Sequence, residues 1–315
     1  MRQLETPVVL IAFNRPDTVR KVFEAVAQAR PTRLLLIADG PRADRPGETE
    51  RCDEVRKIVT TVDWPCEVQT NFAQLNMGCR RRIISGLDWV FSQVEEAIIF
   101  EDDCLPDPSF FPFCHEMLER YRGDSRIAAI SGTNLVEKHM DTPYSYYFSQ
   151  LGGNWGWATW RTRWTDFDEH LKGWPELRAA GGLSKVFDRP KDIAYWTGKF
   201  DSIYAGGEQS AWDYQWFYAR LFGNKLSITP SVNLIENIGH APGATHTVIP
   251  DSRLMPKAKT LEFPLKHPND VVASHSADLR QLDLNFKTPF RQMIRVINYL
   301  KDRALAQLSG AKNPR

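Results

Sequence analysis

The sequence has little cysteine, and its cysteines form no recognisable pattern. There are five, an odd number, and no two are spaced as a Cys-x-x-Cys pair; they stand at positions 52, 66, 79, 104 and 114. This spacing argues against a disulfide framework and against a cysteine-ligated zinc site. Reduced or buried thiols are the simpler interpretation.

Long hydrophobic runs are missing too. The apolar stretch VVLIAF at 8–13 is too short for a signal peptide, and no small-residue cleavage site follows it. No later run reaches the length of about 20 residues that a membrane-spanning helix needs. A cytoplasmic protein is therefore expected.

Charge of one sign is not in excess, because 40 Lys and Arg residues balance 39 Asp and Glu residues. This balance provides no overall attraction for nucleic acid, and no nucleic-acid partner is expected. Repeats, linkers and low-complexity tracts are absent. The length of 315 residues fits one elaborate domain or two closely packed ones.

The first hundred residues contain a regular alternation of strand and helix signals. Short β-branched runs predict strands, and apolar residues at helical spacing predict helices. The predicted strands are 8–13, 33–39, 66–72 and 96–100, and the predicted helices are 16–30, 48–62 and 81–94. A helix from about 108 and a strand at 127–132 follow. This order predicts an α/β fold with a mostly parallel sheet covered by helices on both faces.

Three consecutive acids, Glu101, Asp102 and Asp103, follow the fourth predicted strand. The carboxyl ends of parallel strands form the edge at which open α/β sheets bind ligands. Adjacent ionised carboxylates repel one another, and a divalent cation such as Mg²⁺ relieves this repulsion while leaving coordination positions for phosphate oxygens. A metal-bound diphosphate is the functional interpretation. A simple turn or helix cap before Pro108 is the alternative.

The segments VVLIAFNRP, IADGPR and RRIISGLDWVFSQVEEAIIFEDDCLPDPSFFPFCHEMLERY resemble the nucleotide-sugar-binding part of GT-A glycosyltransferases. They are most similar to the N-acetylglucosaminyltransferase I type and its bacterial relatives. The resemblance implies a GT-A fold in which 1–135 is a Rossmann-like nucleotide-sugar-binding half. The acceptor and catalytic half of the same domain would be 136–250, and 251–315 would be a C-terminal extension.

The resemblance also implies roles for single residues. Asp103 would coordinate the metal, Mn²⁺ or Mg²⁺, while Glu101 and Asp102 would lie against the sugar and ribose of the donor. Asp39 would read the nucleobase, and Arg15 would approach the phosphates. The chemistry of these residues agrees in part, because an arginine between a strand end and a helix N-terminus can pair with a phosphate oxygen.

Two of the donor-binding residues have simpler alternatives. Asp39 can accept a hydrogen bond from a ring N–H such as that of uracil, but an aspartate before Gly40 is also common in turns. Where the family has a donor-contacting histidine, this sequence has Arg82. The basic run 80–82 can equally be the solvated start of a helix.

The catalytic base is expected in the second half of the chain, which is rich in aromatic residues and glycine. An inverting transfer needs a carboxylate that takes the proton of the acceptor hydroxyl. The segment SAWDYQWFYARLFG at 210–223 resembles the aromatic-flanked aspartate segment of the family, with one residue inserted, and makes Asp213 the first candidate and Glu208 the second. Trp212 and Trp216 would desolvate this carboxylate. Alternatively, Asp213 starts a helix whose tryptophans belong to the core.

The segment GGNWGWATWR at 152–161 combines glycines with tryptophans that can stack on sugars, and Trp157 is expected to contact the donor. Packing anchors on a tight glycine turn are the alternative. His240 and His246 stand on a glycine-rich segment that could close over the donor. The basic amphipathic pattern at 290–308 predicts a helix that touches the inner face of a membrane or packs on the body or another subunit.

The leading hypothesis is a metal-dependent glycosyltransferase, either a hexosyl- or an N-acetylhexosaminyltransferase, of the kind used in polysaccharide biosynthesis. It would move a sugar from a nucleotide-sugar donor, a UDP-sugar by preference, to a hydroxyl of a glycan or lipid-linked saccharide with inversion. A sugar-1-phosphate nucleotidylyltransferase is one alternative, although IAFNRPD lacks the glycine-rich loop usual after the first strand of such enzymes. A non-catalytic carbohydrate-binding protein is the other.

Overall fold

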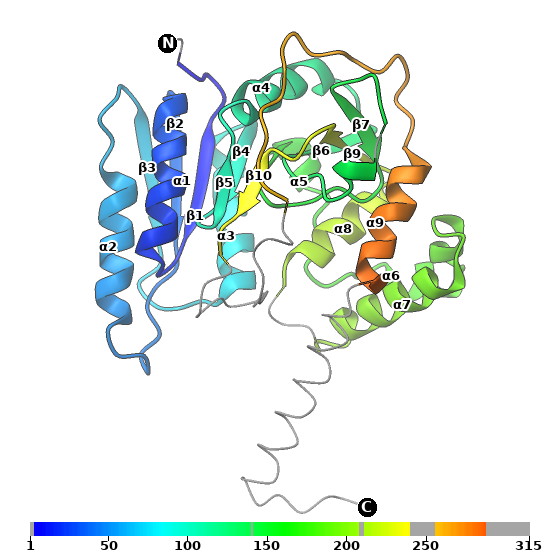
Figure 1. The fold of residues 1–315 in the computed structure, drawn as a ribbon. Coiled ribbons are helices and arrows are strands. Elements are labelled where there is room, and N and C mark those ends of the chain that lie inside the picture. Colours follow the sequence, from blue (N-terminus) through cyan, green and yellow to red (C-terminus); the bar gives the residue numbers. More distant parts are fainter. Residues whose placement is uncertain (1–2, 140, 208–210, 240–255, 288–315) are drawn as a thin grey trace, which may run out of the picture.

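The structure, a computed structural model, describes residues 3–139, 141–207, 211–239 and 256–287 (Figure 1). Its centre is an eight-stranded sheet in the order β3-β2-β1-β4-β8-β6-β9-β7. The strands are β1 (Val8–Ala12), β2 (Arg33–Ala38), β3 (Glu67–Phe72), β4 (Glu96–Glu101), β6 (Ile127–Ser131), β7 (Tyr146–Ser149), β8 (Trp157–Trp160) and β9 (Leu226–Pro230).

The sheet is mostly parallel. All pairs among β3, β2, β1 and β4 are parallel. The strands β6 and β9 run in the same direction as β4. This follows because β8 is antiparallel to both β4 and β6, and β9 is parallel to β6. Only β8 and the edge strand β7 run in the opposite direction. The predicted α/β fold class is thereby confirmed.

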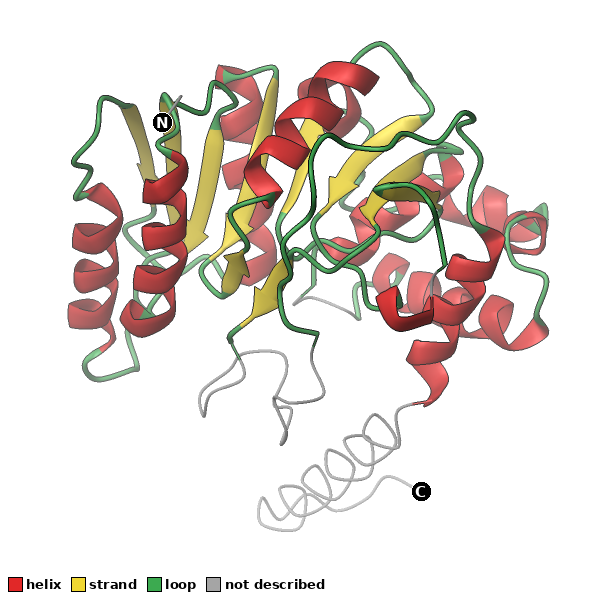
Figure 2. Ribbon diagram, turned by 45° about the horizontal axis from the view of Figure 1, so that its top comes forward, coloured by secondary structure: helices red, strands yellow, loops and turns green. Residues whose placement is uncertain are grey.

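Helices cover both faces of the sheet (Figure 2). One face carries α1 (Pro16–Ala29), α2 (Glu48–Thr60) and α4 (Phe110–Tyr121), and the other carries α3 (Cys79–Gln93), the short α5 (Arg161–Trp164) and α8 (Asp213–Phe222). Successive strand residues face opposite ways, so that Val8 and Leu10 pack with the first layer while Val9 and Ile11 pack with the second. A strand buried on both faces is therefore continuously hydrophobic, as VVLIA is.

The remaining described elements surround the second half of the sheet. The connections there contain α6 (Trp174–Ala179), α7 (Pro190–Tyr204) and the 3₁₀ turns at Glu137–His139 and Gly182–Lys185. The helix α9 (His275–Lys287) packs against β7. The short strand β10 (Ile235–Asn237) pairs antiparallel with β5 (Cys104–Pro106). The helix predicted at 290–308 lies outside the described residues. Among the described helices, none is long and apolar enough to cross a membrane.

Phe100 is the core residue directly before the acidic triplet, and its truncation tests the packing below the site. Its ring is fully buried against Phe110 and Phe111, with centroid distances of 5.5 and 5.6 Å. We expect Phe100→Ala to lower the free energy of unfolding by about 3–5 kcal/mol, because it leaves a cavity that the rigid strand cannot close. Urea unfolding measures the change. The control Val68→Ala, at a residue 37% exposed, should change it far less.

Candidate functional site

The predicted site residues of the first half gather at the carboxyl edge of the sheet. Arg15 follows β1, Asp39 follows β2, Glu101 ends β4, and Asp102 and Asp103 form the turn between β4 and β5. Because β2, β1 and β4 are parallel neighbours, these chain ends lie side by side. Open α/β sheets bind ligands at this edge.

An ion pair between Arg15 and Asp102 joins the loop after β1 to the turn after β4. Asp102 also accepts a hydrogen bond of 3.2 Å from the backbone N–H of Phe13, and the second amino group of Arg15 lies 3.0 Å from Oδ2 of Asp103. Burial lowers the pKa of Arg15, but the attraction of the two aspartates outweighs burial and raises it overall. Arg15 is thus permanently charged and held between the two carboxylates.

The acids of the site influence one another strongly. Burial, and then the negative charges of Asp103, Asp102 and Asp213, raise the pKa of Glu101 to about 8. Burial followed by Glu101, Asp213, Asp102 and Asp39 likewise raises the pKa of Cys79, the first residue of α3, to about 12. The structure therefore brings Asp213 into the electrostatic field of the triplet, although more than 100 residues separate them in sequence. No local sequence pattern indicates this position for Cys79.

Asp213 is the first residue of α8, and the tryptophans beside it are core residues. Trp212 and Trp216 are 5% and 1% exposed and pack with Trp157 and Trp164 in one cluster. The cluster packs the start of α8 against the sheet and so fixes the position of the Asp213 backbone. The second candidate base, Glu208, lies outside the described residues.

Trp157 belongs to the core and not to a ligand-facing surface. Its side chain is 1% exposed, with its ring stacked on Trp212 at 5.6 Å and tilted against Trp216 at 5.7 Å. β8 lies between β4 and β6 in the sheet, and helices cover both faces of the sheet there. The side chain of Trp157 therefore has no face open to a ligand. The predicted contact of Trp157 with the donor is corrected accordingly, and the alternative of a packing anchor describes this residue.

Asp39 holds two loops together. Its buried carboxylate accepts hydrogen bonds from the backbone N–H groups of Gly40, Met77 and Gly78 at 2.8, 2.9 and 3.1 Å and from the amide of Asn76 at 3.0 Å. A Cβ on Gly40 would lie 2.4 Å from the backbone of Leu75, so only glycine permits this close approach. Direct recognition of a nucleobase by Asp39 would require one of these hydrogen bonds to be exchanged.

Arg82 also makes hydrogen bonds within the protein. It is 4% exposed and donates from Nε to the backbone oxygen of Ala38 at 3.1 Å and from Nη2 to the side-chain oxygen of Asn71 at 2.7 Å. Its pKa is lowered, chiefly by burial. Arg82 is therefore not solvated at the start of the helix. It also cannot direct all of its N–H donors at a ligand, because several already bond within the protein. It ties α3 to the ends of β2 and β3.

The segment after β10 closes over the acidic turn. The backbone N–H of Ile238 donates to the backbone oxygen of Asp103 at 2.8 Å, and a Cβ on Gly239 would lie 2.2 Å from Oδ2 of Asp103. A side chain at position 239 would therefore displace the side chains of Asp103 and Arg15. His240 and His246, expected on the same segment, lie outside the described residues.

The acids present suit a hard divalent cation. Arg15 pairs with Asp102 and Asp103, and burial, followed by the charges of the neighbouring aspartates, raises the pKa of Glu101. Among the residues that the structure describes, no group of three or more acidic, histidine or cysteine side chains is arranged to hold a metal. Mg²⁺ commonly takes one or two protein carboxylates and completes its shell with water and phosphate oxygens. Asp103, whose side chain is 17% exposed, is the carboxylate available for this.

Glu48 is a site residue that the sequence analysis missed. It is fully buried at the start of α2 and accepts hydrogen bonds from Asn14 at 2.8 Å and from the backbone N–H of Arg42 at 2.7 Å. The guanidinium of Arg42 also pairs with it at 2.5 Å and lies over the ring of Phe13. Glu48 thereby fixes the loops after β1 and β2 relative to each other. Its contact with Asn14 joins segments 34 residues apart, and an acid in a first helical turn gives no sign of this contact.

No family model and no curated protein matches this chain. A structure of UDP-glucose pyrophosphorylase complexed with UDP-glucose is similar over 48% of this chain and 64% of that one, with 13% identity and a TM-score of 0.27. A 4-diphosphocytidyl-2C-methyl-D-erythritol synthase from Anaerococcus prevotii is similar over 50% and 71%, with 10% identity and a TM-score of 0.32. This chain thus spans less than two thirds of the pyrophosphorylase. Likenesses of this size do not identify an activity.

The contribution of Glu48 to stability should depend on pH. Hydrogen bonds from Arg42 lower the pKa of Glu48 from 4.5 to about 2. A carboxylate whose pKa falls on folding stabilises the protein above its unfolded pKa and loses this effect as the pH drops toward the folded one. We expect Glu48→Gln to cost about 1–2 kcal/mol at pH 7.

The difference between wild type and Glu48→Gln should shrink as the pH is lowered from 4.5 toward 2. Urea unfolding of both proteins between pH 7 and the lowest pH at which they remain folded measures it. A difference that stays constant over this range would contradict the assignment. Glu50→Gln, an exposed acid in the same helical turn, is the control.

Proposed function

We propose that the protein is a nucleotide-sugar-dependent glycosyltransferase that uses a divalent cation. One observation carries the proposal: Asp213, from the second half of the chain, lies in the electrostatic field of the Glu101–Asp103 triplet beside Arg15. A cation-binding acid, a permanent positive charge and a second carboxylate near one sheet edge are the groups that sugar transfer from a diphosphate needs.

The donor would bind along the carboxyl edge. Its base would lie near the loop after β3, where Leu75 and Met77 are exposed beside the hydrogen-bonded Asp39. Arg15 would approach the diphosphate, and Asp103 would hold Mg²⁺ or Mn²⁺. When bound, this ion would neutralise negative charge on the departing diphosphate.

Asp213 would act as the base. Its carboxylate accepts the proton of the acceptor hydroxyl while the acceptor oxygen forms a bond to the anomeric carbon. The bond between that carbon and the diphosphate oxygen breaks, and its electron pair leaves with the nucleoside diphosphate. The buried tryptophans beneath α8 keep the base in position.

Nucleotidyl transfer is the second candidate. The two structural neighbours named above are nucleotidyltransferases, one of them in complex with UDP-glucose, and neither is a glycosyltransferase. Against this, the loop after β1 consists of Phe13, Asn14 and Arg15 in place of a glycine-rich turn. The two reactions leave different products, so product analysis separates them.

Incubation with UDP-, GDP- and dTDP-sugars and Mn²⁺, with and without pyrophosphate, tests the proposal. A glycosyltransferase releases nucleoside diphosphate, by transfer or slow hydrolysis, whether or not pyrophosphate is present. A nucleotidylyltransferase releases nucleoside triphosphate and sugar 1-phosphate, and only with pyrophosphate. We expect the diphosphate. The triphosphate would overturn the proposal in favour of the second candidate.

Asp213→Asn tests the base. We expect this variant to bind the donor within a few-fold of wild type and to release nucleoside diphosphate about 10²–10⁴-fold more slowly, the usual contribution of general-base catalysis. Asp188→Asn, at an exposed acid outside the site, should react normally. Equal loss of donor binding and turnover would instead assign Asp213 to donor binding.

Asp103→Asn tests the metal ligand. We expect UDP binding in the presence of Mn²⁺, measured by isothermal titration calorimetry, to weaken by at least about tenfold, because the amide loses the charge that attracts the ion. Wild type treated with a chelator should show the same weak binding. Tight UDP binding by chelated wild type would contradict a metal-dependent site.

A further inference from the structure

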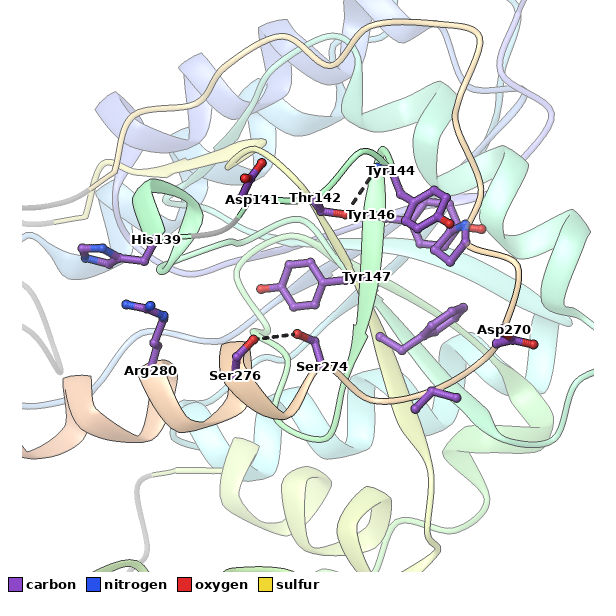
Figure 3. A pocket seen from close by; sticks show the side chains of 13 residues that line it. His139, Asp141, Thr142, Tyr144, Tyr146, Tyr147, Asp270, Ser274, Ser276 and Arg280 are labelled. Carbon is purple, nitrogen blue, oxygen red and sulfur yellow. Dashed lines mark hydrogen bonds between the residues drawn. The ribbon is translucent and has the colours of Figure 1, made fainter.

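A hollow of about 290 Å³ lies beside the edge strand β7, remote from the acidic site (Figure 3). None of its lining residues belongs to the loops after β1, β2 or β4. Three strands separate β7 from β4, which at the usual strand spacing corresponds to about 19 Å. The hollow is therefore a separate feature of the molecule.

The hollow has an aromatic floor and a polar rim. Tyr146, Tyr147 and Phe148 on β7 form the floor, but their rings are almost wholly covered. The half-buried Tyr144 and the exposed Val272 provide the accessible apolar surface. The rim carries exposed side chains of mixed character: Asp141, Asp270, His139, Arg280 and Ser276. Figure 3 shows the ring of Tyr147 projecting between Thr142 on one side and Ser274 and Ser276 on the other.

Hydrogen bonds hold the walls in place before any ligand arrives. The segment before α9 is tied to β7 by reciprocal hydrogen bonds of 2.8 Å between Ser145 and Lys266 and by the backbone N–H of Ser274, which donates to Phe148 at 2.7 Å. The buried Asp278 of α9 accepts a hydrogen bond from Gln150 at 3.1 Å. A preformed surface loses little conformational entropy on binding.

We propose that this hollow is a second carbohydrate-binding site that takes a neutral saccharide. The half-buried ring of Tyr144 and the exposed side chain of Val272 offer apolar surface to the C–H groups of a sugar, and a rim of carboxylates, hydroxyls and a guanidinium offers both acceptors and donors to its hydroxyls. The rim carries two carboxylates, Asp141 and Asp270, against Arg280 and the weakly basic His139, and this balance disfavours phosphate or a nucleotide.

The size of the hollow agrees with a small ligand. Sites for small molecules span roughly 300–1,000 Å³, and this hollow is just below that range. It suits one or two sugar units of a longer chain. The site goes beyond the proposed function, because it needs neither the nucleotide donor nor a metal, and its binding is measured without either.

Saturation-transfer NMR and titration with free neutral saccharides test the proposal. The probes are cellobiose, lactose, maltotriose and di-N-acetylchitobiose, with inorganic phosphate as an anionic probe, in the presence of chelator. We expect at least one saccharide to bind wild type, and Tyr144→Ala and Arg280→Ala each to weaken it about fivefold or more. Tyr204→Ala, which removes a tyrosine 51% exposed on α7, should leave binding unchanged.

Asp103→Asn assigns the bound saccharide to one of the two sites. Saccharide binding that persists in Asp103→Asn and falls in Tyr144→Ala supports the proposal. Binding that falls in Asp103→Asn and persists in Tyr144→Ala places the saccharide at the acidic site and overturns it. Binding of phosphate alone, or of none of the probes, by wild type that melts normally also overturns it.

Discussion

The buried ion pair between Arg15 and Asp102 is the interaction on which the geometry of the acidic site depends. Asp102 is 3% exposed, and a carboxylate so far from water is tolerated only with a cation and further donors, here Arg15 and the N–H of Phe13. The pair fixes the turn after β4 against the loop after β1. Because the turn is only two residues long, fixing Asp102 also fixes Glu101 and Asp103.

Several carboxyl groups lie close together at the same edge of the sheet. Arg15 is shared by two aspartates, and Glu101 is left with a pKa raised to about 8. Such an arrangement costs stability, and the proposed cation would recover part of it on binding. By contrast, Glu48 is fully matched by Arg42 and Asn14. Glu48 therefore has a structural role, whereas the proposed ligand site is at the triplet.

The sequence predicted the first half of the fold well, because its signals there are local. Buried strands such as VVLIA and helices with one apolar stripe are fixed by neighbouring residues, and all the predicted strands and helices up to 132 are confirmed. The site was predictable only where a residue directly follows a strand, as Arg15 and Asp103 do. Glu48, Cys79 and Gly239 acquire their surroundings from distant segments, which no local pattern reports. For Trp157 the local pattern misled, because burial on both faces of β8 depends on the strand order.

The most direct test of the account is a crystal structure with UDP and Mn²⁺, read by anomalous scattering from manganese. The account predicts one strong anomalous peak in coordination contact with the carboxylate of Asp103 and with the diphosphate, with Arg15 beside the phosphates. Nucleotide bound elsewhere on the sheet, or bound at this edge with no manganese at Asp103, would contradict it.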